Sequence, residues 1–460
     1  GGDVVITVDG KLSGWSPAIS IASGESGGTL TNNGTVLGAT IGIDNQGIVA
    51  GIVNDGIISG QNTGIKNHSS ISFIENSGTV TSSGGRAIYN DGSIGTISNS
   101  KTIYSNAGDV ISNNSGSTIG TISNSGNISS LSSSAILNRG SIGVISNSGT
   151  ISSTSGNAIS NRSSGSIGTI SNSGLIQSKY FAIRNEPGTG ALTITNSGTI
   201  AGALGYDGST IGGAMTISGG VDDSKYGLLT GEKATTASTD IGEIGHRFVD
   251  FHFGTGYLLL NDNIDVADNS VINEGATLKL VNGITITGNY RQTGGGLVIQ
   301  VASPSSFGSL TVLASATDMV GMTGSANISN TTLVMSGNNL AVGDTYTIVG
   351  AAKSGTYTIT SASVVGTSGR GATTATVGKD LVVTITEAKS VGYQSIGAQN
   401  GGAASSFGAT LDQINNSSST QAVAFQNNVL AVINSLPSSQ QGSAIKKLAP
   451  ASAANNVQVL

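Results

Sequence analysis

Two phase-locked series of asparagine residues constrain the fold of this 460-residue chain more than any other feature. The first follows the phrase aliphatic-x-Asn, then a small or polar residue and usually Gly, as in Ile52–Gly56. The second follows small-Ile-x-Asn, as in Ala87–Asn90. Members of the first series are 22 to 25 residues apart, and each member of the second follows one of the first by 13 or 14 residues. The first series is Asn32, Asn54, Asn76, Asn99, Asn124, Asn147, Asn172 and Asn196; the second is Asn45, Asn67, Asn90, Asn113, Asn138, Asn161 and Asn185. Self-similarity at a fixed period predicts a repeat architecture.

The length of the repeat selects the architecture. Helical repeats are longer, roughly 33 to 47 residues, and leucine-rich repeats of similar length need a leucine scaffold that is missing here. Short alternating segments such as Thr150-Ile151-Ser152 place Ile on one face of a strand and Ser or Thr on the other. We therefore predict an all-β chain, a right-handed parallel β-helix solenoid with coils of about 23 residues, followed by a short α-helical C-terminal linker.

The asparagines are predicted to be structural. A coil turns sharply between its faces, and Asn tolerates the left-handed backbone conformations that turns use. Stacked coils would place equivalent Asn side chains about 4.8 Å apart, where their amides can bond along a ladder. A Gly two residues later would serve the same corner. We expect ladders rather than a ligand site.

Composition and spacing divide the chain into five segments. The predicted segments are 1–28 as an N-terminal cap, 29–200 as regular β-helix repeats, 201–255 as an irregular coil or loop region, 256–390 as a C-terminal β-helix with a closing cap, and 391–460 as the helical linker. In the last segment Phe407, Leu411 and Ile414 have helical spacing, and Pro437 is expected to break the helix.

The closing part of the chain resembles a known family. Segment 288–299, with Tyr290-Arg291-Gln292 ahead of Gly294-Gly295-Gly296, its continuations at 307–312 and 342–348, and the tail at 443–450 carry the resemblance. They are similar to the end of bacterial autotransporter (type V secretion) passenger domains of the self-associating or adhesin kind. The resemblance implies an autochaperone-like cap within 256–390 that helps the β-helix to fold after export.

The same resemblance implies a location. The tail would lead into an outer-membrane β-barrel expected beyond Leu460, which would provide the only contact with the membrane. The chain would then be displayed at the cell surface of a Gram-negative bacterium, or secreted after cleavage. Because Gly1 is not an initiator methionine, we expect a processed or trimmed piece.

Charge and composition disfavour several classes of protein. The net charge of −6, with only 10% charged residues, disfavours nucleic-acid binding, and 37% hydrophobic residues disfavour disorder. The chain has no Cys, which excludes disulfides and thiolate metal sites. No apolar run approaches the roughly 18 residues of a membrane-spanning helix.

A possible nucleophile lies in Gly24-Glu25-Ser26-Gly27-Gly28, which resembles the serine loop of chymotrypsin-like proteases. In that order of residues a His precedes the Ser, but the first His here is His68, inside a repeat. The strand, elbow and long helix of α/β-hydrolases are also missing. We expect no nucleophilic role for Ser26.

Two histidines could form a metal or acid–base site. His246 and His252 are flanked by Glu243, Arg247 and Asp250. The alternative is a solvated loop that packs nearby aromatic side chains, Phe248, Phe251 and Phe253. We expect the loop, because the same residue types are common in solvated loops.

Three acidic residues, Asp262, Asp265 and Asp268, could bind calcium, but their spacing matches neither an EF-hand nor a Gly-rich nonapeptide repeat. We expect them to be exposed turn carboxylates. Accordingly, we assign no catalytic, cofactor-binding or metal-binding residue and expect no cofactor.

Parallel β-helices also include polysaccharide lyases and hydrolases, which need acidic or basic residues clustered on one face. The charges of the repeats look scattered here, at Asp44, Asp55, Glu75, Arg86, Asp91, Asp109, Arg139 and Arg162. No acidic column emerges beside the first Asn series, where Val53 and Glu75 are followed by serines. We therefore expect that the chain is not an enzyme.

A long face of Ser, Thr and Asn remains, which suits multivalent weak binding. We expect an adhesin that acts by self-association of bacteria, as in aggregation and biofilm, or by attachment to host or matrix ligands. Its partner would be the identical chain on a neighbouring cell, or a host glycan or matrix protein, and not nucleic acid. The alternatives are a non-binding stalk, a toxin-like passenger or a polysaccharide-degrading β-helix enzyme.

Overall fold

The computed structural model describes residues 4–6, 10–186, 188–206, 213–232, 240–247, 249–338, 340–367, 369–387, 392–415, 417 and 419–449. The chain forms two compact units. The first comprises Gly1–Leu333, Thr347–Thr360 and Thr376–Leu381, and the second comprises Val334–Tyr346, Ser361–Ala375 and Val382–Leu460.

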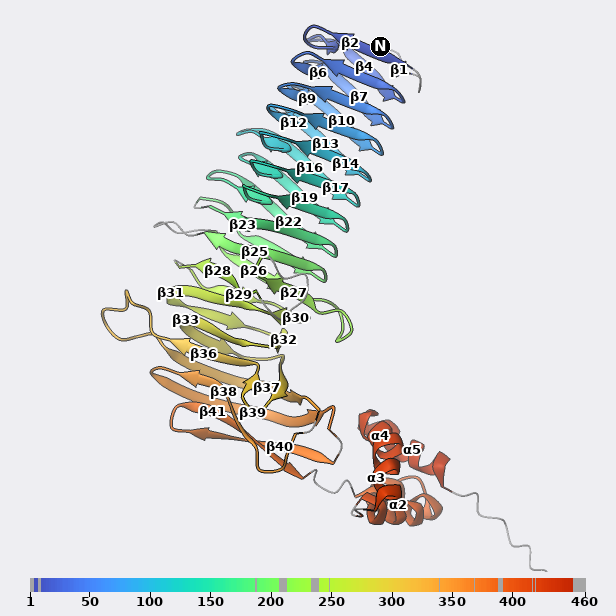
Figure 1. The fold of residues 1–460 in the computed structure, drawn as a ribbon, viewed down its shortest axis with the longest axis vertical. Coiled ribbons are helices and arrows are strands. Elements are labelled where there is room, and N and C mark those ends of the chain that lie inside the picture. The colour runs from blue at the N-terminus through green and yellow to red at the C-terminus, as the bar shows by residue number, and fades with distance from the viewer. Residues whose placement is uncertain are drawn as a thin grey trace, which may run out of the picture. The chain divides into compact units, whose positions relative to one another are not determined.

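The first unit is a parallel β-solenoid in which three stacks of short strands run along its length (Figure 1). Each strand pairs in parallel with its counterpart in the preceding and following coils, so that Asn54, for example, lies opposite Asn32 and Asn76. The predicted parallel β-helix with coils of about 23 residues is confirmed.

The strands of the three stacks repeat in chain order. The first stack contains β1 (Val4–Ile6), β4 (Ser26–Asn32), β7 (Ile48–Asn54), β10 (Ser70–Asn76), β13 (Ser93–Asn99), β16 (Thr118–Asn124), β19 (Ser141–Asn147), β22 (Ser166–Asn172), β24 (Leu192–Asn196), β26 (Met215–Ser218) and β29 (Phe251–Phe253). The second contains β2 (Lys11–Gly14), β5 (Thr35–Gly38), β8 (Ile57–Gly60), β11 (Thr79–Ser82), β14 (Thr102–Ser105), β17 (Asn127–Ser130), β20 (Thr150–Ser153), β27 (Gly227–Thr230), β30 (Tyr257–Leu260), β32 (Thr277–Leu280) and β34 (Gly296–Ser303). The third contains β3 (Ile19–Ile21), β6 (Ile41–Asn45), β9 (Thr63–Asn67), β12 (Arg86–Asn90), β15 (Ile111–Asn113), β18 (Ile136–Asn138), β21 (Ile159–Asn161), β28 (Gly242–His246) and β36 (Ser309–Leu313).

Longer strands run through two stacks without a break. These are β23 (Leu175–Asn185), β25 (Thr199–Tyr206), β31 (Asp262–Asn273) and β33 (Gly283–Gln292). Further strands are β35 (Ser306–Phe307), β37 (Ser325–Ser336), β38 (Thr345–Ala351), β39 (Ser354–Val365), β40 (Arg370–Val377) and β41 (Asp380–Glu387). Parallel pairing also occurs among the described residues of 201–255, where Leu204 lies opposite Ile244 and Ile217 opposite Phe253.

Columns of aliphatic residues fill the interior of the solenoid. Ile122 and Ile145 lie opposite each other in adjacent coils, and neither is exposed. Their neighbours in the strand point outward, as the two-residue period of a strand requires. Burying such a side chain stabilises the fold by roughly 1.5–3 kcal/mol relative to leaving it in water. The repeated aliphatic pattern therefore specifies which face of every strand is inside.

The second unit contains the helical tail. Its helices are α1 (Tyr393–Ala398), α2 (Gly402–Asn415), α3 (Thr420–Phe425), the π-helical turn η1 (Gln426–Leu430), α4 (Ala431–Ser435) and α5 (Ser438–Leu448). Tyr393, Leu411 and Ile445 are buried in their common core, and Asp412 accepts hydrogen bonds from the backbone at the start of α1. Pro437 separates α4 from α5, so the predicted helical segment with a break at this residue is confirmed. None of the helices in the described part of the chain is long and apolar enough to cross a membrane.

Candidate functional site: the polar ladders of the solenoid

The asparagines of the two series lie one above the next and form two continuous side-chain ladders. In every link the Nδ2 of one Asn donates to the Oδ1 of the Asn in the following coil over 2.7 to 2.8 Å. All these residues are at most 2% exposed. Since an amide has both donors and an acceptor, each Asn can bond to the coil before it and the coil after it.

Each ladder amide also bonds to the backbone of the corners. Asn147 Nδ2, for example, donates to the carbonyl of Gly149 in its own coil over 3.2 Å and to that of Leu175 in the next coil over 3.1 Å. The same pattern recurs along both series. The ladders therefore tie each corner to the following coil, and their amide groups are directed into the structure rather than toward solvent.

The prediction that these asparagines adopt left-handed backbone conformations at the corners was wrong. In the described part of the chain a positive φ occurs at only three residues other than Gly: Ser164, Ala267 and Asn330. The ladder Asn residues do not need the left-handed region, so hydrogen bonding alone explains them. Gly149 also has an ordinary φ, and a side chain there would place its Cβ 2.1 Å from the carbonyl oxygen of Gly126 in the preceding coil.

A third ladder, built from serine, escaped the sequence analysis. It consists of residues that end strands of the second stack or lie at the same register in β23: Ser82, Ser105, Ser130, Ser153 and Ser178. These side chains are at most 5% exposed, and Ser153 Oγ donates to the carbonyl of Ser133 over 2.6 Å while accepting from Gly156 N over 2.8 Å. An aliphatic-x-Ser phrase marks these positions, but so many serines face outward that composition hides them.

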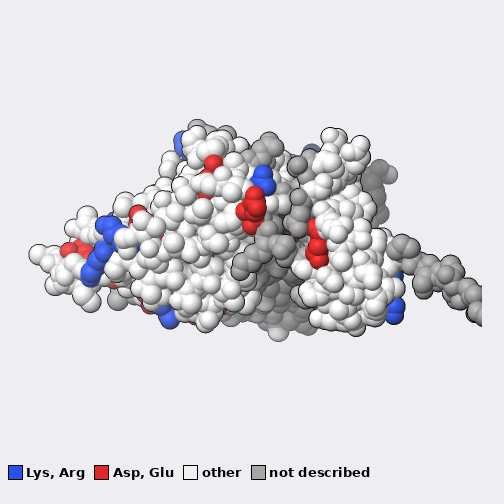
Figure 2. All heavy atoms as spheres, turned by 90° about the horizontal axis from the view of Figure 1, so that it is seen from below, with Lys and Arg blue, Asp and Glu red and all other residues white. Residues whose placement is uncertain are grey.

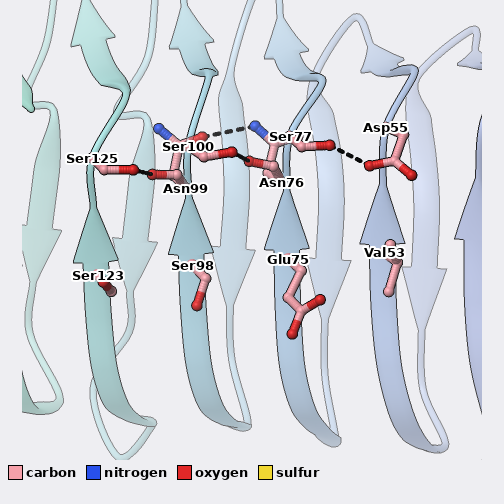
Figure 3. A pocket seen from close by; sticks show the side chains of 10 residues that line it. All are labelled: Val53, Asp55, Glu75, Asn76, Ser77, Ser98, Asn99, Ser100, Ser123 and Ser125. Atoms are coloured by element: carbon pink, nitrogen blue, oxygen red, sulfur yellow. Dashed lines mark hydrogen bonds between the residues drawn. The ribbon is translucent and has the colours of Figure 1, made fainter.

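A shallow groove of about 280 Å³ follows the first Asn ladder on the outside of the solenoid. Figure 3 shows its two rows of side chains, one on the strands and one at the corners. The strand row is Val53, Glu75, Ser98 and Ser123, and the corner row is Asp55, Ser77, Ser100 and Ser125. The corner hydroxyls bond back to the solenoid: Ser100 and Ser125 donate to carbonyls of the preceding coil over 3.3 and 3.4 Å, and Ser77 donates to Asp55. Each coil thus presents hydroxyl or carboxylate groups that can bond a polar partner.

Two groups of ion pairs lie beside the second Asn ladder. His68 lies 3.8 Å from Asp44 and 3.5 Å from Asp91, which belong to adjacent coils. Further along, Glu186 forms ion pairs with Arg162 at 3.1 Å and with Arg184 at 3.5 Å. Stacking thus brings together charges that looked scattered in the sequence. On the face shown in Figure 2, most described atoms belong to residues that are neither basic nor acidic.

The structure separates the other candidate residues. Ser26 is exposed at the start of β4, whereas His68 pairs with Asp44 and Asp91 of the adjacent coils. His252 forms a 3.1 Å contact with Glu274. Arg247 pairs with Asp265 over 2.7 Å, and Asp268 accepts a hydrogen bond from Thr317. These residues therefore form separate local contacts rather than one catalytic cluster.

The solvated loop expected around the two histidines is wrong for His246. This residue ends β28, is only 4% exposed and contacts the ring of Phe251 edge-to-face at 5.7 Å. Burial lowers the pKa of His246 to about 4, with His252 adding to the effect. Phe251 and Phe253 are buried core residues, and Phe248 lies outside the described residues.

The exposed carboxylate predicted at Asp262 is also wrong, because this side chain is fully buried at the start of β31. Asp262 follows the corner residue Asn261, and the corner folds it into the solenoid. Across the described residues no group of three or more His, Cys, Asp or Glu side chains is placed to hold a metal ion. Comparison with models of protein families, with curated protein sequences and with solved structures finds no match to this chain.

Proposed function

We propose that this chain is the passenger of an autotransporter of a Gram-negative bacterium, displayed at the cell surface or released from it, and that it acts as a non-enzymatic adhesin. The observation that carries the proposal is the outer face of the first stack, where hydroxyl side chains repeat in register from coil to coil. Ser123, Ser146 and Ser171 lie opposite one another on successive strands and are exposed. A second column on the same face contains Thr96, Thr121, Val144 and Thr169.

The partner that fits this face best is a second copy of the same chain. Equivalent side chains repeat every coil, at about 4.8 Å, so two copies have the same spacing and can match over many coils. Each hydroxyl both donates and accepts, which lets identical surfaces pair. Individually weak contacts then add up through multivalency, because the first contact raises the effective concentration of the rest.

Cell clumping tests the proposal. The chain is displayed through an outer-membrane barrel on a non-aggregating bacterium, and clumps should form only when both cells of a pair carry it. The double variant Ser123→Lys/Ser146→Lys should abolish clumping by like-charge repulsion between facing copies. A mixture of these cells with cells carrying Ser123→Asp/Ser146→Asp should clump again. The matched control Ser129→Lys/Ser152→Lys changes the second stack and should leave clumping intact.

The outcomes separate two kinds of adhesin. If wild-type cells do not clump, self-association is refuted, and the next experiment is binding of the purified chain to host glycans and matrix proteins. If cells clump but the control variant disrupts clumping as strongly as the first double variant, the first-stack face is not the interface.

A further inference from the structure

A buried acidic corner lies in the first unit, apart from the polar ladders. The side chain of Asp262 is fully buried, and neither of its carboxylate oxygens has a hydrogen-bond partner within the described residues. A second carboxyl, that of Asp240, is close enough to act on it electrostatically. Moving a carboxylate out of water without a partner costs several kcal/mol or more, and a second negative charge nearby adds to that cost.

Both carboxylates border the same piece of backbone. A Cβ on Gly242 would lie 1.7 Å from Asp262 Oδ1 and 2.8 Å from Gly231 N. A Cβ on Gly231 would lie 2.7 Å from Asp240 Oδ2. The two glycines therefore leave room for carboxylate oxygens that any side chain at those positions would displace.

A buried network holds Asp240 in this place. Its backbone carbonyl accepts hydrogen bonds from Gly231 N over 3.0 Å, from Thr230 Oγ1 over 2.9 Å and from Asn261 Nδ2 over 2.8 Å. Asn261 is itself fixed by Asn282, which donates to its Oδ1 over 2.8 Å. These hydrogen bonds, and not a contact between the two acidic side chains, thus fix the position of Asp240 beside Asp262.

We propose that Asp262 and Asp240 bind a divalent cation, with calcium the best match, at the corner formed by Thr230–Gly231 and Gly242. The two carboxylates supply the oxygen atoms of the corner, and oxygen is the ligand type that calcium prefers. The Thr230 hydroxyl and the Asn261 amide nitrogen already bond to the Asp240 carbonyl and fix the corner around them. Calcium tolerates irregular geometry and completes its shell of six to eight ligands with carbonyl groups and water. A cation there would neutralise the two carboxylates and satisfy the unpartnered oxygens of Asp262.

Burial and the neighbouring Asp240 carboxyl both raise the pKa of Asp262 well above its ordinary value. In the absence of a cation the side chain therefore binds a proton more readily than an ordinary carboxyl group does. Calcium and protons compete for the same oxygens, so calcium binding should weaken as the pH falls.

Calcium titration of the purified full chain, first stripped with a chelator, tests the proposal. Isothermal calorimetry should show binding at one site, and the thermal unfolding temperature should rise with calcium and then saturate. Asp262→Asn and Asp240→Asn should each weaken binding by at least about tenfold, because each removes one charged ligand. Asp223→Asn, a change in an exposed loop, is the matched control and should bind calcium like the wild type.

Two results would overturn the proposal. One is a wild-type chain that gives neither binding heat nor a shift in unfolding temperature with calcium. The other is undiminished calcium binding by both the Asp262→Asn and Asp240→Asn variants. Should Asp262→Asn fail to fold, Asp240→Asn alone decides, because Asp240 is only half-buried and its side chain is easier to replace.

Discussion

Replacing Asn147 by Ala in the middle of the first ladder should destabilise the solenoid strongly. The change removes the 2.8 Å bond from Asn124 Nδ2 to Asn147 Oδ1, the 2.8 Å bond from Asn147 Nδ2 to Asn172 Oδ1, and the 3.1 Å bond to the carbonyl of Leu175. It also leaves the buried Oδ1 of Asn172 without the donor that Asn147 supplies, whereas Asn124 Nδ2 keeps its bonds to the carbonyls of Gly126 and Thr150. With roughly 1 kcal/mol for each of these three bonds and a further desolvation penalty of about 1–3 kcal/mol for groups left unpaired, the free energy of unfolding should fall by about 4–6 kcal/mol.

Urea unfolding measures this loss, and native-state hydrogen exchange locates it. The control is Ser146→Ala, one residue earlier in β19 and exposed, which should change stability by less than about 0.5 kcal/mol. Exchange should quicken first at amides of the coils on either side of Asn147, since each coil of a solenoid contacts only its neighbours. Equal effects of Asn147→Ala and Ser146→Ala would refute the view that the ladder amides hold the coils together.

Three further predictions concern buried polar groups. Ser153→Ala removes two short hydrogen bonds of the serine ladder and should lower the free energy of unfolding in urea by about 1–3 kcal/mol. Ser152→Ala, a change in the outward-facing neighbour, should leave this free energy almost unchanged. Similar losses in the two variants would contradict a separate serine ladder. The pKa of His246 falls from 6.5 to about 4 on folding. The free energy of unfolding should therefore decrease by about 3 kcal/mol as the pH drops from 6.5 to about 4. His246→Leu should abolish this pH dependence of stability. An unchanged pH profile in the variant would show that His246 does not cause the dependence. Folding raises the pKa of Asp262 above 3.8, so in chelator the wild type should lose stability as the pH rises through the folded-state pKa. Asp262→Asn should be the more stable protein at neutral pH under these conditions; a less stable variant would show that the ionised form is not disfavoured.

The sequence alone determined the repeat. The spacing of the two Asn series and the alternation of Ile with Ser or Thr depend only on local geometry, because a strand turns successive side chains to opposite faces. The length of the coil, the inward position of Ile122 and the alignment of Asn54 with Asn76 all follow from that pattern. The helical tail could also be predicted from the sequence, because Phe407, Leu411 and Ile414 recur at the period of a helix.

Burial and pairing between coils were decided only by the tertiary structure. Outward and inward serines have the same local sequence context, so the role of Ser153 depends on a carbonyl of the preceding coil that no local pattern reports. His246 and Asp262 looked like solvated loop residues because their polarity favours water. The end of β28 and the start of β31 nevertheless turn these two side chains into the interior. Stacking likewise created the ion pair between Arg162 and Glu186, which are about one coil apart in the chain. Such contacts arise when coils superpose, which depends on the whole register of the solenoid and not on any single repeat.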